Sequence, residues 1–179
     1  MQKSGGISYE RIIRSRIHRK WQRKEYSGFW SGFKSLVCRQ KVYIAQFIKD
    51  MKYHETGIET VMDGIKIEQL GAGCFIDRKP DEHDREVAAA ALQKCGKILE
   101  SGEFDVVILD EITIALYFKL FSSEDVIKIL QNRNPKVEVV LTGRYAPQEL
   151  IDYADLVTEM REVKHYYTQG VLSRDGIDV

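Results

Sequence analysis

Short, unbroken runs of hydrophobic residues predict the strands of this protein. The run at residues 104–111 contains four consecutive apolar residues, 106–109, rich in β-branched side chains, and ends in two carboxylates, Asp110 and Glu111. A strand that is apolar on both faces is typical of the buried centre of a parallel sheet. Similar runs predict further strands at residues 42–48, 137–141 and 155–159.

The segments between these runs have helical patterns. The clearest is residues 81–100, whose apolar positions share one face, with acidic residues in the first turn and Gly102 after the end. Residues 60–70 instead predict two strands joined by a turn at Asp63-Gly64. Strands alternating with helices predict an α/β fold, a mostly parallel sheet with helices on both faces. Shorter helices are predicted at residues 112–120, 122–132 and 147–154.

The two carboxylates at the end of the central run have two interpretations. In an open α/β sheet the carboxyl ends of the strands face the ligand crevice, where Asp110 and Glu111 would hold a divalent metal on a nucleotide phosphate. Alternatively, the pair ends the strand and caps the helix that begins near Ile112. The run alone supports both interpretations equally.

Two further polar groups follow predicted strands. Thr142, Gly143 and Arg144 come directly after one strand, and Arg161, Lys164 and His165 after another. Hydroxyl and cationic groups beside a metal-binding carboxylate form the expected lining of a triphosphate pocket. Singly, each has a plainer explanation, since Arg144 can be a surface cation and Lys164 and His165 can finish a strand. Together at one sheet edge they favour the pocket, although no Gly-x-x-x-x-Gly-Lys-Ser/Thr phosphate loop occurs in the chain.

Composition narrows the class of protein. The 179 residues predict a single globular domain, and the three cysteines, without a Cys-x-x-Cys pair, predict a reduced, cytoplasmic location with neither disulfides nor zinc. No hydrophobic run is long enough to cross a membrane.

Residues 1–40 hold ten Lys/Arg and two acids, a charge of +8, which leaves −8 on residues 41–179. Such a break is typical of a basic arm that binds nucleic acid, with aromatic rings stacking on bases. Residues 1–40 show no strand or helix period.

Several segments of residues 41–179 resemble the P-loop type of corrinoid adenosyltransferase, in order and at family spacing. They are Val42 to Lys49, Val106 to Glu111, Val140 to Arg144 and Ala154 to His165, followed by Gly170 and Gly176-Ile177-Asp178. The resemblance implies a P-loop nucleotide-hydrolase (RecA-like) architecture. It also implies transfer of the 5′-deoxyadenosyl group from Mg-ATP to the Co(I) of a reduced corrinoid, with release of triphosphate.

The resemblance assigns roles residue by residue. Asp110 and Glu111 would bind Mg²⁺ or Mn²⁺, with Glu111 and Arg144 as catalytic residues, and the partners would be ATP, a reduced corrinoid, a flavoprotein reductant and a second copy of the chain. No nucleic acid or membrane partner is implied. The family's Gly-Phe-x-Trp loop on the corrinoid falls on residues 73–76, where Cys74 and Ile76 replace the aromatics and an apolar lining would exclude water from cobalt. The substrate-binding set is Gly73, Cys74, Phe75, Ile76, Thr142, Gly143, Arg161, Lys164 and His165.

The phosphate loop expected near residues 18–28 is recovered by a change of reading frame. One set of codons for these residues, read one base later, encodes Thr-Gly-Asn-Gly-Lys-Gly-Lys-Ser-Thr-Ala. The single tryptophan codon always shifts to glycine, and Trp21 and Trp30 both fall where the family has glycine. Lys24 followed by Glu25 can shift only to Lys or Arg, at the position of the phosphate-binding lysine. We therefore interpret residues 11–40 as an out-of-frame translation of the loop and its helix.

This interpretation divides the chain into an aberrant basic segment, residues 1–40, and an α/β nucleotide- and corrinoid-binding domain, residues 41–179. Phosphate loops point backbone N–H groups at the phosphates, and Trp21 and Arg23 stand where glycines must let phosphate approach. We expect weak ATP binding and loss of the first strand. The alternatives are a catalytically inactive nucleotide-fold or corrinoid-binding remnant and, third, a genuine nucleic-acid arm.

Overall fold

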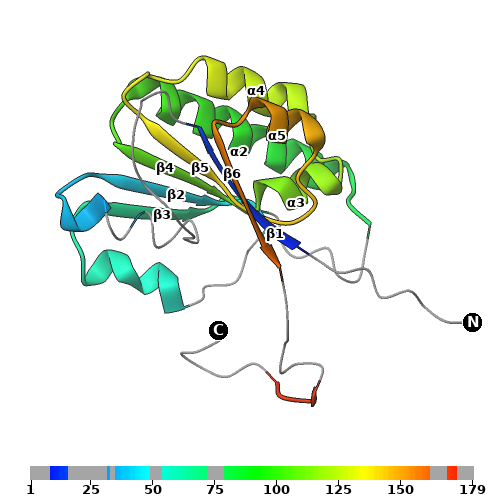
Figure 1. Cartoon of the computed structure of the whole chain (residues 1–179), viewed down its shortest axis with the longest axis horizontal. Coiled ribbons are helices and arrows are strands. Elements are labelled where there is room, and N and C mark those ends of the chain that lie inside the picture. Colours follow the sequence, from blue (N-terminus) through cyan, green and yellow to red (C-terminus); the bar gives the residue numbers. More distant parts are fainter. Residues whose placement is uncertain are drawn as a thin grey trace, which may run out of the picture.

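The computed structural model describes residues 9–15, 32, 35–48, 54–71, 79–161 and 169–172 (Figure 1). Its centre is a six-stranded sheet with the strand order β3-β2-β4-β5-β1-β6. β2, β3, β4 and β5 are parallel neighbours, whereas β1 runs antiparallel to both β5 and β6. The strands are β1 (Tyr9–Ser15), β2 (Val42–Gln46), β3 (Ile65–Gln69), β4 (Val106–Asp110), β5 (Glu138–Leu141) and β6 (Leu156–Arg161).

The predicted helices form close to their expected bounds. They are α2 (Glu82–Ser101), α3 (Ile112–Tyr117), α4 (Ser123–Gln131) and α5 (Gln148–Tyr153). At the start of α2 the Asp81 side chain accepts a hydrogen bond from the Asp84 N–H, and the Asp84 side chain accepts one from the Asp81 N–H. This capping box satisfies two backbone N–H groups that lack a helical acceptor. Gly102 ends α2 in the left-handed conformation, at φ 66°. Pro147 precedes the first residue of α5 as its N-cap.

Each face of the sheet has its own hydrophobic core, because alternate strand residues point to opposite sides. Tyr43, Val107 and Val139 pack under α2, α3, α4 and α5, which cover one face (Figure 1). Ile44 and Ile108 point to the other face, where they form a smaller cluster with Leu36 and with Ile58 and Met62 packed against it. β2 and β4 are fully buried, and β5 is buried except at its first residue, Glu138, which explains the apolar runs of the sequence.

The hairpin predicted at residues 60–70 is wrong in its first half. η1 (His54–Thr60), a 3₁₀-helix, precedes the turn, and the Thr60 hydroxyl donates to the Gly57 carbonyl at 2.7 Å. Only β3 follows the turn as a strand, and it pairs in parallel with β2 rather than with the residues before it. Upstream of the turn, Ile58 and Met62 pack against the smaller core, whereas Val61 is exposed.

The expectation that residues 1–40 lack a first strand is also wrong. β1 forms at Tyr9–Ser15, because hydrogen bonding to β5 on one side and β6 on the other stabilises a strand whose sequence shows no period. Its direction is reversed relative to those strands. Ser15, at its carboxyl end, pairs with Val139 near the start of β5. β1 therefore ends at the sheet edge opposite to the one where Asp110 ends β4.

A charged cluster joins β3 to α2 above the larger core. The Tyr43 hydroxyl donates to Glu68 Oε2 at 2.5 Å, and Lys94 Nζ lies 2.7 Å from the same oxygen. Lys66 Nζ lies 3.2 Å from Glu68 Oε1. Partial burial raises the pKa of Glu68, but hydrogen bonds from Lys94, Tyr43 and Lys66 outweigh it and lower that pKa to about 2. Burial, followed by the bond to Glu68, raises the pKa of Tyr43.

A neighbouring cysteine is sealed within the same core. Cys95, in α2, has no exposed surface and is a free thiol. Burial raises the pKa of this thiol to about 12, because a thiolate would lose its hydration there. Cys38, in contrast, is exposed.

We expect Glu68→Gln to destabilise the fold at neutral pH and to be neutral in strong acid. The carboxylate has a lower pKa in the folded state than its ordinary 4.5, so its contribution is present above pH 4.5 and is lost as the pH falls towards 2. Urea unfolding at pH 7 should show a loss of roughly 1 kcal/mol, since the group is only partly buried. The same substitution at exposed Glu100 is the control. A pH-independent difference would contradict this assignment.

Candidate functional site

A buried carboxylate lies where three parallel strands end. Asp110, the last residue of β4, is 8% exposed. Its Oδ1 accepts from the Thr142 hydroxyl at 2.6 Å, and its Oδ2 accepts from Gln46 Nε2 at 3.3 Å. Gln69 Nε2 donates in turn to Gln46 Oε1 at 3.3 Å. A chain of hydrogen bonds therefore crosses the carboxyl ends of β3, β2 and β4 to the residue that follows β5.

Glu111 turns the chain away from the strand. Its backbone adopts the left-handed conformation, at φ 62°, and its N–H donates to the Thr142 hydroxyl at 3.1 Å. It occupies the N-cap position of α3, but its side chain makes no capping hydrogen bond. Asp110 is likewise bound to strand-end groups rather than to the helix. The helix-cap interpretation of this carboxylate pair is therefore wrong for both side chains.

Gly143 brings the segment after β5 against α3. Its φ is +129°, and a Cβ there would lie 2.3 Å from Thr113 Oγ1 and 3.3 Å from Glu111 Cα. The Thr113 hydroxyl donates to the Thr142 carbonyl at 3.4 Å. Only glycine permits both this conformation and this close approach. The backbone of residues 142–143 thus forms one wall beside Asp110 and Glu111.

The structure brings together four of the residues proposed from the sequence. Asp110, Glu111, Thr142 and Gly143 are adjacent, and the exposed Arg144 follows them. Arg161 ends β6 at the same edge, because β6 and β5 share a direction. The remaining candidates lie outside the described residues, so their roles stay predictions; they are Gly73, Cys74, Phe75, Ile76, Lys164 and His165.

Gln46 and Gln69 are site residues that the sequence reasoning missed. Gln46 is fully buried and is the register partner of Asp110, and Gln69 is the register partner of Gln46. The sequence contains a pattern that predicts Gln46, because Gln46 follows the apolar residues 42–45 just as Asp110 follows the apolar residues 106–109. A polar side chain at the end of a buried strand predicts a site at that edge whether it is charged or neutral.

The donor set fits a magnesium ion that also binds phosphate. Within the described part of the chain, no group of three or more His, Cys, Asp or Glu side chains is placed to hold a metal. Mg²⁺ usually needs only one or two carboxylates, since waters and substrate phosphates supply its other ligands. Asp110 and Glu111 meet that requirement. In the described segments, no helix is both long and apolar enough to span a bilayer.

Comparisons with known proteins show which family the sequence resembles. A family model described as ATP:corrinoid adenosyltransferase BtuR/CobO/CobP matches residues 24–179. A corrinoid adenosyltransferase of Sinorhizobium sp is 30% identical over 165 residues, which cover 89% of this chain and 76% of the relative. The corrinoid adenosyltransferase of Escherichia coli K12 is 27% identical over 157 residues, covering 87% of this chain and 79% of the relative. One from Pseudomonas aeruginosa is 30% identical over 159 residues, covering 87% and 77%.

We expect Thr142→Val to destabilise the protein by roughly 1–3 kcal/mol, because the buried Asp110 carboxylate loses its shortest hydrogen bond and the Glu111 N–H loses its acceptor. Thr142→Ser keeps the hydroxyl and is the matched control. Urea unfolding of both variants at neutral pH measures the difference. Equal stability of the two variants would mean that the hydroxyl contributes little.

Proposed function

This chain belongs to the ATP:corrinoid adenosyltransferase family BtuR/CobO/CobP, and on that premise we propose that it transfers the 5′-deoxyadenosyl group of ATP to a reduced corrinoid. In this reaction a bond forms between Co(I) and the 5′ carbon, and the bond from that carbon to oxygen breaks, releasing triphosphate. The observation that carries the proposal is the hydrogen-bonded Asp110 beside Glu111 at the carboxyl edge of the sheet.

The proposed roles follow from how the side chains are held. Hydrogen bonds to both oxygens fix the orientation of the Asp110 carboxylate, so it costs little reorganisation when a cation binds. Asp110 and Glu111 would hold Mg²⁺ or Mn²⁺, which supplies positive charge to the triphosphate. Thr142, Gly143 and Arg144 follow β5 beside them and would contact phosphate oxygens, with Arg144 neutralising charge on the leaving group.

The other parts of the proposal rest on the family resemblance. Arg161, Lys164 and His165 would add cations to the triphosphate site. Residues 73–76 would line the corrinoid face and exclude water from cobalt. We also propose a homodimer and a flavoprotein reductant that delivers the Co(I) state.

We propose further that residues 11–40 are an out-of-frame version of the family's phosphate loop and first helix. A phosphate loop follows the first strand at the ligand edge of such a sheet. Here the carboxyl end of β1 lies at the opposite edge from Asp110, which supports the proposal. The family match begins at residue 24, so it omits residues 1–23 but includes 24–40. Sequencing the gene across this interval tests the frame directly.

The reversed β1 also favours a second candidate function, an inactive nucleotide-fold remnant that retains corrinoid binding. Loss of the Co(I) spectrum on addition of Mg-ATP distinguishes the two candidates. The remnant would bind the corrinoid without this change, whereas the enzyme would consume Co(I) at a rate that depends on ATP.

We expect the chain as printed to bind Mg-ATP weakly, because glycines are absent where phosphate must approach the backbone. Replacing residues 18–27 by Thr-Gly-Asn-Gly-Lys-Gly-Lys-Ser-Thr-Ala should tighten binding at least roughly tenfold. Isothermal titration with Mg-ATP compares the two chains. Micromolar binding by the unmodified chain would contradict the proposal for residues 18–27.

In the chain that carries the replaced loop, we expect Glu111→Gln to lower the rate of Co(I) loss roughly 100-fold, as for removal of one group that stabilises the developing charge. Raising the Mg²⁺ concentration should recover part of the rate if the lost carboxylate binds the ion. Glu103→Gln, at an exposed position before β4, is the control. An unchanged rate would remove Glu111 from the site.

A further inference from the structure

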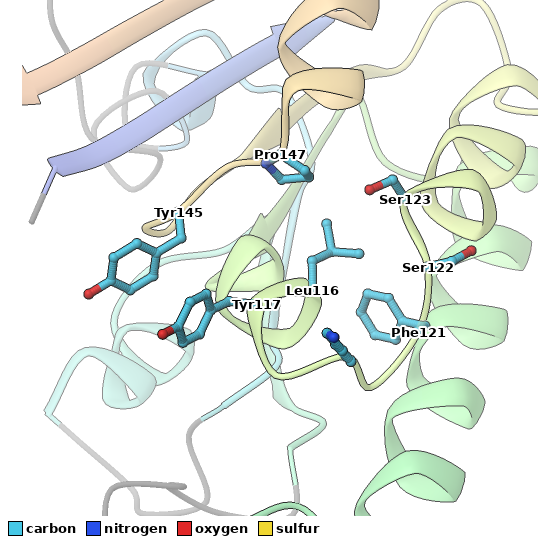
Figure 2. Close-up of a pocket in the computed structure, with 8 residues that line it drawn as sticks. Leu116, Tyr117, Phe121, Ser122, Ser123, Tyr145 and Pro147 are labelled. Carbon is cyan, nitrogen blue, oxygen red and sulfur yellow. The ribbon is translucent and has the colours of Figure 1, made fainter.

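A hollow lined by residues that follow Glu111 and Thr142 in the chain is used by none of the roles proposed so far. It has a volume of about 460 Å³ and lies between the connection from α3 to α4 and the segment that joins β5 to α5 (Figure 2). Leu116, Phe121 and Pro147 form apolar walls, and Lys119, Ser122 and Ser123 supply polar groups. The volume is within the range of small-ligand pockets.

Two stacked tyrosines lie at its rim. The rings of Tyr117 and Tyr145 are stacked, with centroids 4.4 Å apart and planes 29° from parallel. Both residues remain more than half exposed, at 57% and 52%. In Figure 2 the two rings lie side by side, at one side of the hollow. Because so much of each ring faces solvent, the pair buries little surface in the fold and leaves aromatic surface accessible to a ligand.

The backbone around the hollow is held in uncommon conformations. Lys119 and Tyr145 have φ values of 56° and 59°, in the left-handed region that non-glycine residues rarely adopt. Glu111, at the start of α3, is a third such residue. In the described chain only Arg39 adds a fourth. Strain of this kind concentrates at ligand sites, where it fixes side chains in a set direction.

The hollow has one cation but few other polar groups available. The Ser122 hydroxyl is already occupied, since it donates to the Asp125 carboxylate and accepts from the Asp125 N–H in the cap of α4. Lys119 is exposed and forms no ion pair within the described residues. The hollow therefore offers an apolar wall, an aromatic face and one ammonium group, which suit a flat ring that carries an anion.

We propose that this pocket binds a planar heteroaromatic base carrying a phosphate, with the base on the outer face of the stacked Tyr117–Tyr145 pair and the phosphate near Lys119. Tyr117 follows Glu111 by six residues and Tyr145 follows Thr142 by three, so the ligand would lie beside the triphosphate site. Resting on the proposed function, two sources supply this chemistry. One is the adenine nucleotide of ATP, and the other is the nucleotide tail of a complete corrinoid.

Binding of adenosine monophosphate to the unmodified chain tests the pocket without the phosphate loop. Tyr117→Ala removes one ring at a position of ordinary helical backbone, and if the base is adenine it should weaken binding roughly tenfold or more, as loss of a base-stacking ring does. Tyr117→Phe keeps the ring and should bind like the parent chain. Lys119→Asn tolerates the left-handed backbone and should weaken binding and reduce its salt dependence. Ribose 5-phosphate, which has no base, should not distinguish the two Tyr117 variants.

The same variants identify the source of the base. If it is the corrinoid tail, Tyr117→Ala weakens binding of the oxidised complete corrinoid and of the free tail nucleotide, but not that of a corrinoid lacking the tail, and adenosine monophosphate binding is unaffected. If it is adenine, the opposite pattern is expected. The proposal is overturned if none of these ligands responds to Tyr117→Ala. It is also overturned if the substitution acts only by dissociating a dimer in sedimentation, because the rings would then be a contact between copies.

These outcomes separate the pocket from the proposed function. Adenosyl transfer that is unaffected by Tyr117→Ala, with either a tailed or a tailless corrinoid, would overturn the pocket and leave the enzyme standing. Ring-dependent nucleotide binding without any adenosyl transfer would support the pocket and count against the enzyme.

Discussion

A single buried carboxylate ties together the carboxyl ends of the parallel strands. Asp110 is almost inaccessible to water, so its charge must be satisfied by protein donors or by a cation. The donors come from Gln46 on β2 and from Thr142 after β5. Because Gln46 is the register partner of Asp110, a shift of either strand by one residue would remove this donor and reverse both core faces. The charge of the candidate site and the register of the sheet therefore depend on each other.

The N-terminal strand is the point where the chain departs from what this arrangement requires. β1 lies between β5 and the edge strand β6, so the sheet is continuous, yet it runs in the opposite direction to both neighbours. Backbone pairing is satisfied in either direction, and the position can be filled without the geometry that a phosphate loop needs. The parallel strands and their polar ends do not depend on β1 for their own pairing. The carboxylates proposed to bind the metal can therefore keep their positions whatever the direction of β1.

The elements that sequence reasoning predicted well are those with strong local signals. β4 and α2 combine an unmistakable pattern with clear end signals, and both form as expected. Residues 60–62 and β1 were mispredicted because tertiary packing and backbone pairing outweighed local pattern there. At the candidate site, the charged groups at strand ends are predicted from the sequence, whereas the hydrogen bonds of Gln46 and Gln69 are not, because a neutral amide lacks the charge that suggests a metal or phosphate site. Tyr117 and Tyr145 come together only through the fold, since Tyr117 is the last residue of α3 and Tyr145 lies in the segment after β5.

Because Cys95 is fully buried, its reactivity reports on local opening of the fold around it. Its thiol is buried and has a raised pKa, so almost none of it is the nucleophilic thiolate at neutral pH. It can react with an alkylating reagent only when α2 lifts away from β2 and β4 and admits water. The rate of that reaction, compared with the rapid modification of the exposed Cys38, would therefore measure how often α2 separates locally from the sheet.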